Sequence, residues 1–313
     1  MSEQRVETSE TAASLDNLVK DVSVESKDGI VCLTGKYSPS AEHCRRFVEI
    51  TGDRNPLHLI PYEGHFIAPG LLQTTFAFLF SRRALAERNY NIRDYPFSAD
   101  EADMKLPVIS GGNYPIDASL KEENEQLHFD LWLNKNRNNP AAYAYHLKRE
   151  MKPKKPKDFF PLANPNAFVY RQLVNVNEKG MPTQFGKLIG SESSESHLCA
   201  LALSSSGIFS ALDKRKFPPL AKGIVALYTN QKIFMDSSKT LVGNGKIALE
   251  LYLSGEKEFS GEIDEKSGLA EMSILARDAE GKLIYMVNCI LSFQDKERIA
   301  QILIRRALRG QKD

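Results

Sequence analysis

The sequence predicts an α+β protein built from two similar halves, each with one long apolar helix followed by antiparallel strands. Two apolar segments have helical length, Gly70–Arg88 and Ser196–Leu212, and strand-like runs follow each of them. The distance from the middle of the helix to the next strand is similar in both halves, from Ala77 to Leu106 and from Ser206 to Ile233. At 313 residues, the chain is too long for one small domain and long enough for two.

The predicted domain organisation has three parts. Residues 1–16 are rich in Ser, Thr and Glu and are expected to be disordered, residues 17–150 form the first unit, and residues 151–313 form the second. The boundary is placed at Lys148–Lys157, where prolines are mixed with like charges. This segment is interpreted either as an extended linker or as a basic strip that docks phosphates or an acidic protein surface.

In the first unit, a strand is expected near Ile30–Leu33, followed by a helix with Ser38 as its N-cap and Pro39 at its first position. This helix should end at Gly52, because glycine tolerates the left-handed conformation that closes a helix. The central helix Gly70–Arg88 is apolar on more than one face, so it should be buried. Its three phenylalanines, Phe76, Phe78 and Phe80, are interpreted as core residues or as the wall of a tunnel. After the turn-rich segment Asn89–Ser98, strands are expected from Asp103 and over residues 116–120, 127–133 and 141–148.

The second unit is expected to repeat this plan around the apolar helix Ser196–Leu212. Its predicted strands are residues 225–234, 247–253, 269–276 and 283–293. The segment Gly190–His197 contains Glu192, Glu195 and His197, which are either a second proton-transfer set or residues that cap the helix start. Ser204, Ser205 and Ser206 are weak candidates for a nucleophile because no base is identifiable beside them. The tail Asp295–Arg309 predicts a basic amphipathic helix that docks on this chain, on a partner or on a membrane surface.

Composition excludes several classes of function. The chain has 41 Lys and Arg against 40 Asp and Glu, so its net charge of +1 does not indicate a nucleic-acid partner. No apolar run is long enough to span a bilayer, and the polar segment Met1–Lys20 does not resemble a signal peptide. The four cysteines lack the spacing of a zinc site and are expected to be buried thiols, which points to a cytoplasmic protein without a bound metal.

One segment combines an acid, a base, a turn and a following helix start: Thr51-Gly-Asp53-Arg-Asn55-Pro-Leu-His58, then Ile67-Ala-Pro69-Gly70-Leu71. Pro56 holds Asn55 extended, so the loop should be irregular and rigid. Asp53 and His58 can then point into a common space, where a carboxylate and an imidazole are able to hold a water and move its protons. Spacing alone also allows Asp53 to be a turn residue and His58 a core or surface histidine.

This segment resembles the signature of the MaoC-like hydratases and dehydratases, the (R)-specific or type 2 enoyl-CoA hydratases. The resemblance implies a hot-dog fold, a long helix wrapped by an antiparallel sheet. With the repeated second half it implies a double hot-dog of two antiparallel sheets, each around a central helix. Two positions depart from the family pattern, since Pro69 replaces a common histidine and Ile60 a usual acid, and the connection Leu59–Pro69 is short.

The resemblance also implies roles for individual residues. Asp53 and His58 would activate the water that adds to or leaves a 2-enoyl thioester, and the N–H of Gly70 would stabilise the thioester oxygen. Asn55, Pro69 and Leu71 are the predicted substrate-binding residues. No cofactor is expected, because coenzyme A or phosphopantetheine is part of the substrate.

The predicted function is therefore interconversion of 2-enoyl and 3-hydroxyacyl thioesters of coenzyme A or an acyl carrier protein. Two alternatives are a non-catalytic acyl-binding subunit and a hot-dog thioesterase, because fold alone does not determine the reaction. A homodimer stays open, since two fused hot-dog units already supply the pairing that single ones obtain by dimerising.

Overall fold

The computed structural model describes residues 18–135, 143–177, 180–191, 195–214, 224–238, 245–254, 268–295 and 299–305. The segment predicted to be disordered, residues 1–16, lies outside these ranges. The strands are β1 Val19–Lys27, β2 Ile30–Tyr37, β3 Phe97–Met104, β4 Tyr114–Glu123, β5 Gln126–Leu133, β6 Tyr145–Lys152, β7 Phe168–Asn175, β8 Ile224–Asp236, β9 Lys246–Ser254, β10 Gly268–Arg277 and β11 Leu283–Asp295. The helices are α1 Ala41–Thr51, α2 Pro56–Leu59, α3 Gly70–Glu87, α4 Met181–Ile189 and α5 Ser196–Lys214, with short 3-10 turns at η1 Ile92–Asp94 and η2 Pro165–Ala167.

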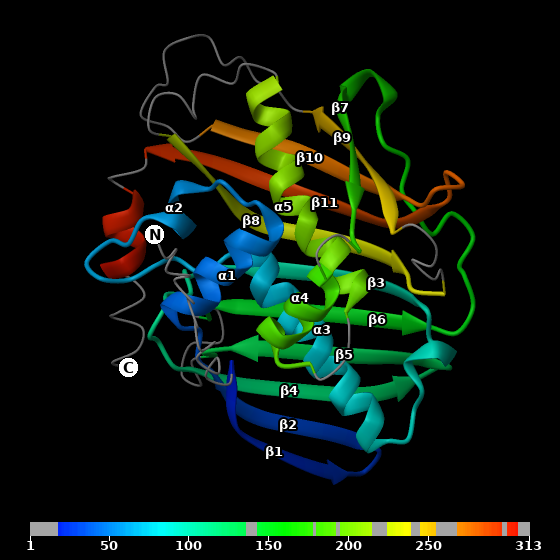
Figure 1. Ribbon diagram of the computed structural model, residues 1–313. Helices are drawn as coiled ribbons and strands as arrows, with labels where there is room; N and C mark the ends of the chain where they lie inside the picture. Colours follow the sequence, from blue (N-terminus) through cyan, green and yellow to red (C-terminus); the bar gives the residue numbers. More distant parts are fainter. Residues whose placement is uncertain are drawn as a thin grey trace, which may run out of the picture.

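The eleven strands of the described ranges form one antiparallel sheet in the order β1-β2-β4-β5-β6-β3-β8-β11-β10-β9-β7. The first six strands in this order come from the first half of the chain, and the last five come from the second half. Figure 1 shows the long helices α3 and α5 against the same face of this curved sheet, α3 over the first half and α5 over the second.

The prediction of two separate sheets is wrong, because the two halves of the chain share one sheet. The halves join where β3 pairs with β8, from Phe97 opposite Asp236 to Asp103 opposite Asn230. A free strand edge leaves a row of backbone N–H and C=O groups without partners. Pairing β3 with β8 removes two such edges, so the halves share one sheet.

Helix α3 is buried on nearly all sides, as its sequence predicted. Phe76, Phe78 and Phe80 are at most 4% exposed and pack into a core that includes residues of both halves. Burying a side chain of this size contributes about 1.5–3 kcal/mol. Polar side chains inside the helix bond to its own backbone, as Thr75 does to the carbonyl of Leu71 at 2.7 Å, so they remain compatible with the core.

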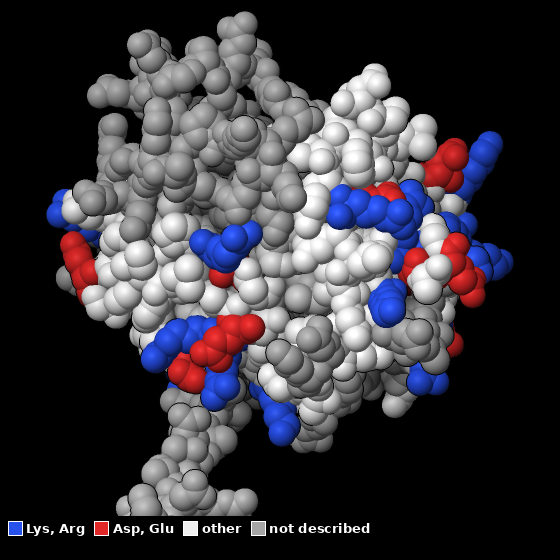
Figure 2. Space-filling model, turned by 45° about the horizontal axis from the view of Figure 1, so that its top comes forward, with Lys and Arg blue, Asp and Glu red and all other residues white. Residues whose placement is uncertain are grey.

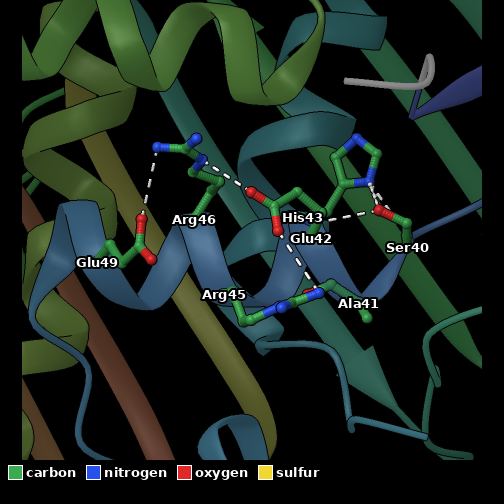
Figure 3. Close-up of polar contacts among 7 residues, drawn as sticks. All are labelled: Ser40, Ala41, Glu42, His43, Arg45, Arg46 and Glu49. Carbon is green, nitrogen blue, oxygen red and sulfur yellow. Dashed lines mark hydrogen bonds and ion pairs between the residues drawn. The ribbon is translucent and has the colours of Figure 1, made fainter. Parts of the chain in front are cut away.

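Helix α1 begins two residues later than predicted. Ser40, not Ser38, is the N-cap, and it forms a reciprocal capping box with His43: Ser40 Oγ accepts from the His43 N–H, and His43 Nδ1 accepts from the Ser40 N–H. Ser38 instead donates its N–H to the carbonyl of Leu18 and its hydroxyl to Asn113. Figure 3 shows this cap together with the exposed ion pairs of Glu42 and Glu49 along α1.

Three further predictions need correction. The segment expected to start as a linker at Lys148 is strand up to Lys152, because Leu147, Arg149 and Met151 alternate into the core. Strands β1 and β7 and helices α2 and α4 were not predicted. Cys32 is exposed, whereas the other three cysteines are buried as expected, and burial raises the pKa of each buried thiol to about 12.

Of the predicted tail helix Asp295–Arg309, residues 299–305 are described as helix, called the C-terminal helix here, and they pack on this same chain, one of the predicted alternatives. Asp295 belongs to β11, and residues 296–298 and 306–309 lie outside the described ranges. The division at residue 150 stays a prediction. On the face drawn in Figure 2, the described Lys and Arg side chains lie in small groups beside Asp and Glu. The charges in view are therefore mixed in sign. Among the described residues, no helix is long and apolar enough to cross a membrane.

Candidate active site

The predicted motif lies in the segment between α1 and α3, residues 52–69, which includes the short helix α2 and is called the motif loop here. Gly52 ends α1 in the left-handed conformation at φ 68°, and its N–H bonds to the carbonyl of Val48. Asp53 Oδ1 accepts the N–H of Asn55 at 2.8 Å, and Asn55 Oδ1 accepts the N–H of Leu57 at 3.2 Å, which caps α2. Two successive side chains thus satisfy backbone donors two residues ahead. This pattern fixes the irregular turn between α1 and α2.

In His58, within α2, one ring nitrogen has a hydrogen-bond partner and the other has none among the described residues. Its Nδ1 lies 2.7 Å from the carbonyl oxygen of Ile67. A carbonyl only accepts, so Nδ1 carries the proton, and in the neutral ring Nε2 is an acceptor. Nε2 is buried and has no hydrogen-bond partner among the described residues. A buried nitrogen in this state is suited to accept a proton from a small polar molecule.

A cavity of about 160 Å³ adjoins His58. Its lining comes from the motif loop, the start of α3, the segment after β3, strand β8 and the C-terminal helix. The lining residues are Asn55, His58, Ile67, Ala68, Gly70, Gln73, Met104, Lys105, Leu106, Pro107, Val108, Leu227 and Leu303. An apolar cavity of about 150 Å³ holds a molecule the size of benzene. The space beside His58 therefore fits a small apolar group with a few polar contacts.

Gly70 brings the start of α3 to the same cavity. The N-cap, Pro69, provides no side-chain hydrogen bond, while its carbonyl accepts the N–H groups of Leu72 and Gln73 at 3.1 and 3.3 Å. The first N–H groups of a helix have no intrahelical acceptor and lie at the positive end of its dipole. The cavity thus combines a basic nitrogen with a helix start suited to a developing negative charge.

Asp53 is placed differently from His58. Its carboxylate is 1% exposed, is not part of the cavity lining, and accepts a hydrogen bond on Oδ2 from the hydroxyl of Ser205 in α5. Of the six predicted site residues, the cavity is lined by His58, Gly70 and Asn55. Pro69 and Leu71 do not line it: Pro69 is the N-cap of α3, and Leu71 lies in the core.

Several residues at or near the cavity were not identified from the sequence. Ser205 was predicted only as a weak nucleophile candidate, whereas in the structure its hydroxyl donates to Asp53 across 152 positions of the chain. Gln73, Lys105, Leu227 and Leu303 also line the cavity. No local pattern marks these four lining residues, because they come from four separate parts of the chain that meet only after folding.

The second candidate set has a structural role in this fold. Glu195 forms an ion pair with Arg82 of α3 at 2.5 Å and accepts the hydroxyl of Ser191 at 2.8 Å. Its carbonyl accepts the N–H of Cys199 in the first turn of α5, which supports the helix-start interpretation. Glu192 lies outside the described residues, and neither Glu195 nor His197 lines the cavity beside His58. The described residues contain no group of three or more His, Cys, Asp or Glu that could hold a metal ion.

Comparison with known proteins identifies solved structures with a similar fold. No family model matches the sequence, and no curated protein matches it. Among solved structures, a MaoC-like dehydratase has a TM-score of 0.53 at 12% identity, over 88% of this chain and 98% of that chain. The chain shares the fold of the MaoC-like dehydratases.

Two further dehydratase structures cover the chain at lower scores. The dehydratase domain from the CurJ module of curacin polyketide synthase has a TM-score of 0.46 at 12% identity, over 90% of this chain and 98% of that chain. The dehydratase domain of PpsC from Mycobacterium tuberculosis, in complex with C12:1-CoA, has a TM-score of 0.47 at 8% identity, over 89% and 100%. At such identities, shared fold does not fix chemistry. The reaction has to be argued from the side chains of the site.

Proposed function

We propose that the protein interconverts 2-enoyl and 3-hydroxyacyl thioesters by adding or removing water. The observation that carries this proposal is that the buried Nε2 of His58 has no hydrogen-bond partner within the described part of the chain and adjoins a cavity shared with the start of α3 at Gly70. Hydration of a conjugated thioester needs a base for water and a donor for the thioester oxygen, and these two groups supply them.

In the hydration direction, a water bonded to His58 Nε2 gives up a proton while its oxygen bonds to carbon 3 of the enoyl group. The electron pair of the double bond moves toward the thioester, and the resulting enolate oxygen accepts the N–H of Gly70. Carbon 2 then takes a proton back from the protonated imidazole of His58, which completes the 3-hydroxyacyl product and returns the site to its starting charge. The hydrogen bond from His58 Nδ1 to the carbonyl of Ile67 holds the ring in the tautomer that these reaction steps require.

We assign Asp53, on the same loop, the role of second proton carrier that the motif predicts. A carboxylate offers about four lone-pair sites. The fold fills one on Oδ1 with the N–H of Asn55 and one on Oδ2 with the hydroxyl of Ser205, which leaves acceptor capacity for a water. Lys105, whose side chain is 54% exposed, also lines the cavity, and its ammonium is suited to the phosphates of coenzyme A or phosphopantetheine.

One observation favours the non-catalytic alternative, an acyl-binding subunit. Asp53 is bonded to Ser205 and does not line the cavity. If this bond persists when an acyl thioester is bound, only one of the two predicted proton carriers reaches the ligand. Such a protein would bind acyl thioesters without converting them.

The test follows the ultraviolet absorbance of the conjugated thioester with short trans-2-enoyl-CoA substrates. We expect absorbance to fall without release of free thiol, and kcat to drop by roughly 10²–10⁴-fold in His58→Ala. His65→Ala is the matched control, because His65 also bonds through Nδ1 to a backbone carbonyl, that of Ser110, but does not line the cavity. Asp53→Asn tests the second carrier. Release of free thiol would indicate a thioesterase, and binding without turnover would indicate the acyl-binding subunit.

A further inference from the structure

The C-terminal helix, residues 299–305, lies outside the main core and covers the motif loop. Figure 1 shows this helix, in red, beside α2, at the left-hand ends of the inner strands. Ala300 and Ile304 are fully buried in a second, smaller apolar cluster that includes Leu57 and Ile67 of the motif loop. The remaining buried members of this cluster are Ile109 and Val225. Residues 299–305 are therefore anchored on the loop that carries His58.

The same helix contributes directly to the cavity. Ala300 and Ile304 are one helical turn apart and face the cluster, while Leu303, adjacent to Ile304, is partly buried and lines the cavity. Leu227 of β8 lines the cavity as well and packs against the same cluster. These two leucines come from the second half of the chain, whereas His58 and Gly70 come from the first. Part of the cavity wall is therefore formed by the C-terminal helix.

We propose that Leu303 and Leu227 limit the size of the acyl group that fits beside His58, so the C-terminal helix determines chain-length specificity. This inference rests on the proposed function in one respect, that the ligand is an acyl thioester. The cavity of about 160 Å³ has room for a short acyl group. Leucine side chains at its boundary exclude longer chains by occupying the volume that added methylenes need.

The experiment measures binding of saturated acyl-CoA by calorimetry, so it does not depend on turnover. Leu303→Ala removes three carbons from the cavity wall, which makes room for about two more methylenes. Each buried methylene strengthens binding by roughly four-fold. We expect the preference for hexanoyl-CoA over butanoyl-CoA to rise by roughly 15-fold in Leu303→Ala, which corresponds to two methylenes.

Two further variants complete this test, one as a control and one with the opposite expected effect. Ile302→Ala is the matched control, because Ile302 lies on the same helix, is 36% exposed and does not line the cavity. It should leave the preference unchanged. Leu303→Phe adds volume at the same position and should shift the preference toward butanoyl-CoA. The thermal midpoint and circular dichroism of each variant report whether the fold is intact.

The outcomes separate this inference from the proposed function. Hydration by the native protein, with an unchanged chain-length preference in Leu303→Ala and Leu303→Phe, would overturn the role of Leu303 alone. Opposite shifts in the two variants without hydration of any enoyl thioester would support the role of Leu303 and reject the hydratase. No binding of any acyl-CoA to the native protein would overturn this inference.

Discussion

Replacement of Arg149 by methionine tests how much the buried ion pair of Arg149 and Asp100 contributes to stability. Arg149 of β6 and Asp100 of β3 are both buried, with 3.4 Å between Arg149 Nε and Asp100 Oδ1. Ser98 Oγ donates to Asp100 Oδ2 at 3.0 Å, and the guanidinium lies 3.9 Å from the ring centroid of Phe78. Removing one partner of a buried ion pair costs about 3–5 kcal/mol, because the other charge stays buried without compensation.

The pH dependence of this loss has a definite sign. Burial raises the pKa of Asp100 from 3.8 to about 6, although Arg149 opposes the rise. A carboxyl with a raised folded-state pKa contributes stability below its unfolded value, and this contribution is lost as pH rises through about 4 to 6. The loss over this window is roughly 3 kcal/mol at about 1.4 kcal/mol per pH unit. Without Arg149 the pKa of Asp100 rises further. The variant should therefore be more destabilised at about pH 8 than at about pH 5.

Urea unfolding of the native protein and Arg149→Met at both pH values measures this difference. Arg45→Met is the matched control, since Arg45 is an exposed arginine in α1 paired with Glu42 at 3.5 Å, and its loss should be below about 1 kcal/mol. The double variant Asp100→Leu with Arg149→Met should recover most of the lost stability, because no unpaired charge remains. Equal destabilisation by Arg149→Met at the two pH values would refute this reasoning.

Three further substitutions test how local sequence supports the fold. Ser40→Ala should lower the free energy of unfolding by about 1 kcal/mol, because the capping box of α1 is lost; an unchanged urea midpoint would contradict this. Gly52→Ala should lower the free energy of unfolding by about 1–2 kcal/mol because of the positive φ at this position. Steric clash is not the cause, since the added Cβ would lie 3.7 Å from Ser206 Cβ. A stabilised variant in the same assay would refute this conformational explanation. Phe185→Ala should lower the free energy of unfolding by about 3–5 kcal/mol. This ring is fully buried, its centroid lies 6.2 Å from that of Phe47, and the contact joins α4 to α1. A loss below about 1 kcal/mol would show that the site collapses around the missing ring.

Much of the architecture was predictable because its signals are local. The glycine that ends α1, the start of α3 at Gly70 and the burial of its phenylalanines were all predicted and are confirmed. Strands β4, β5, β8, β9, β10 and β11 overlap the predicted ones. Strand β1 was missed because only Val19, Val22 and Val24 of its residues are partly buried and pack on the core, so its alternation is too weak to recognise in sequence.

The sequence by itself determined the loop that presents Asn55 and His58, because each turn there depends on a residue within a few positions. It also determined which helices are buried, since burial follows from the spacing of apolar residues. Tertiary structure alone decided that the two halves share one sheet through β3 and β8. It also decided that Asp53 bonds to Ser205 and that Leu227 and Leu303 complete the cavity. These contacts join residues more than a hundred positions apart, and such pairings depend on how packed elements meet in space, which no local pattern of side chains records.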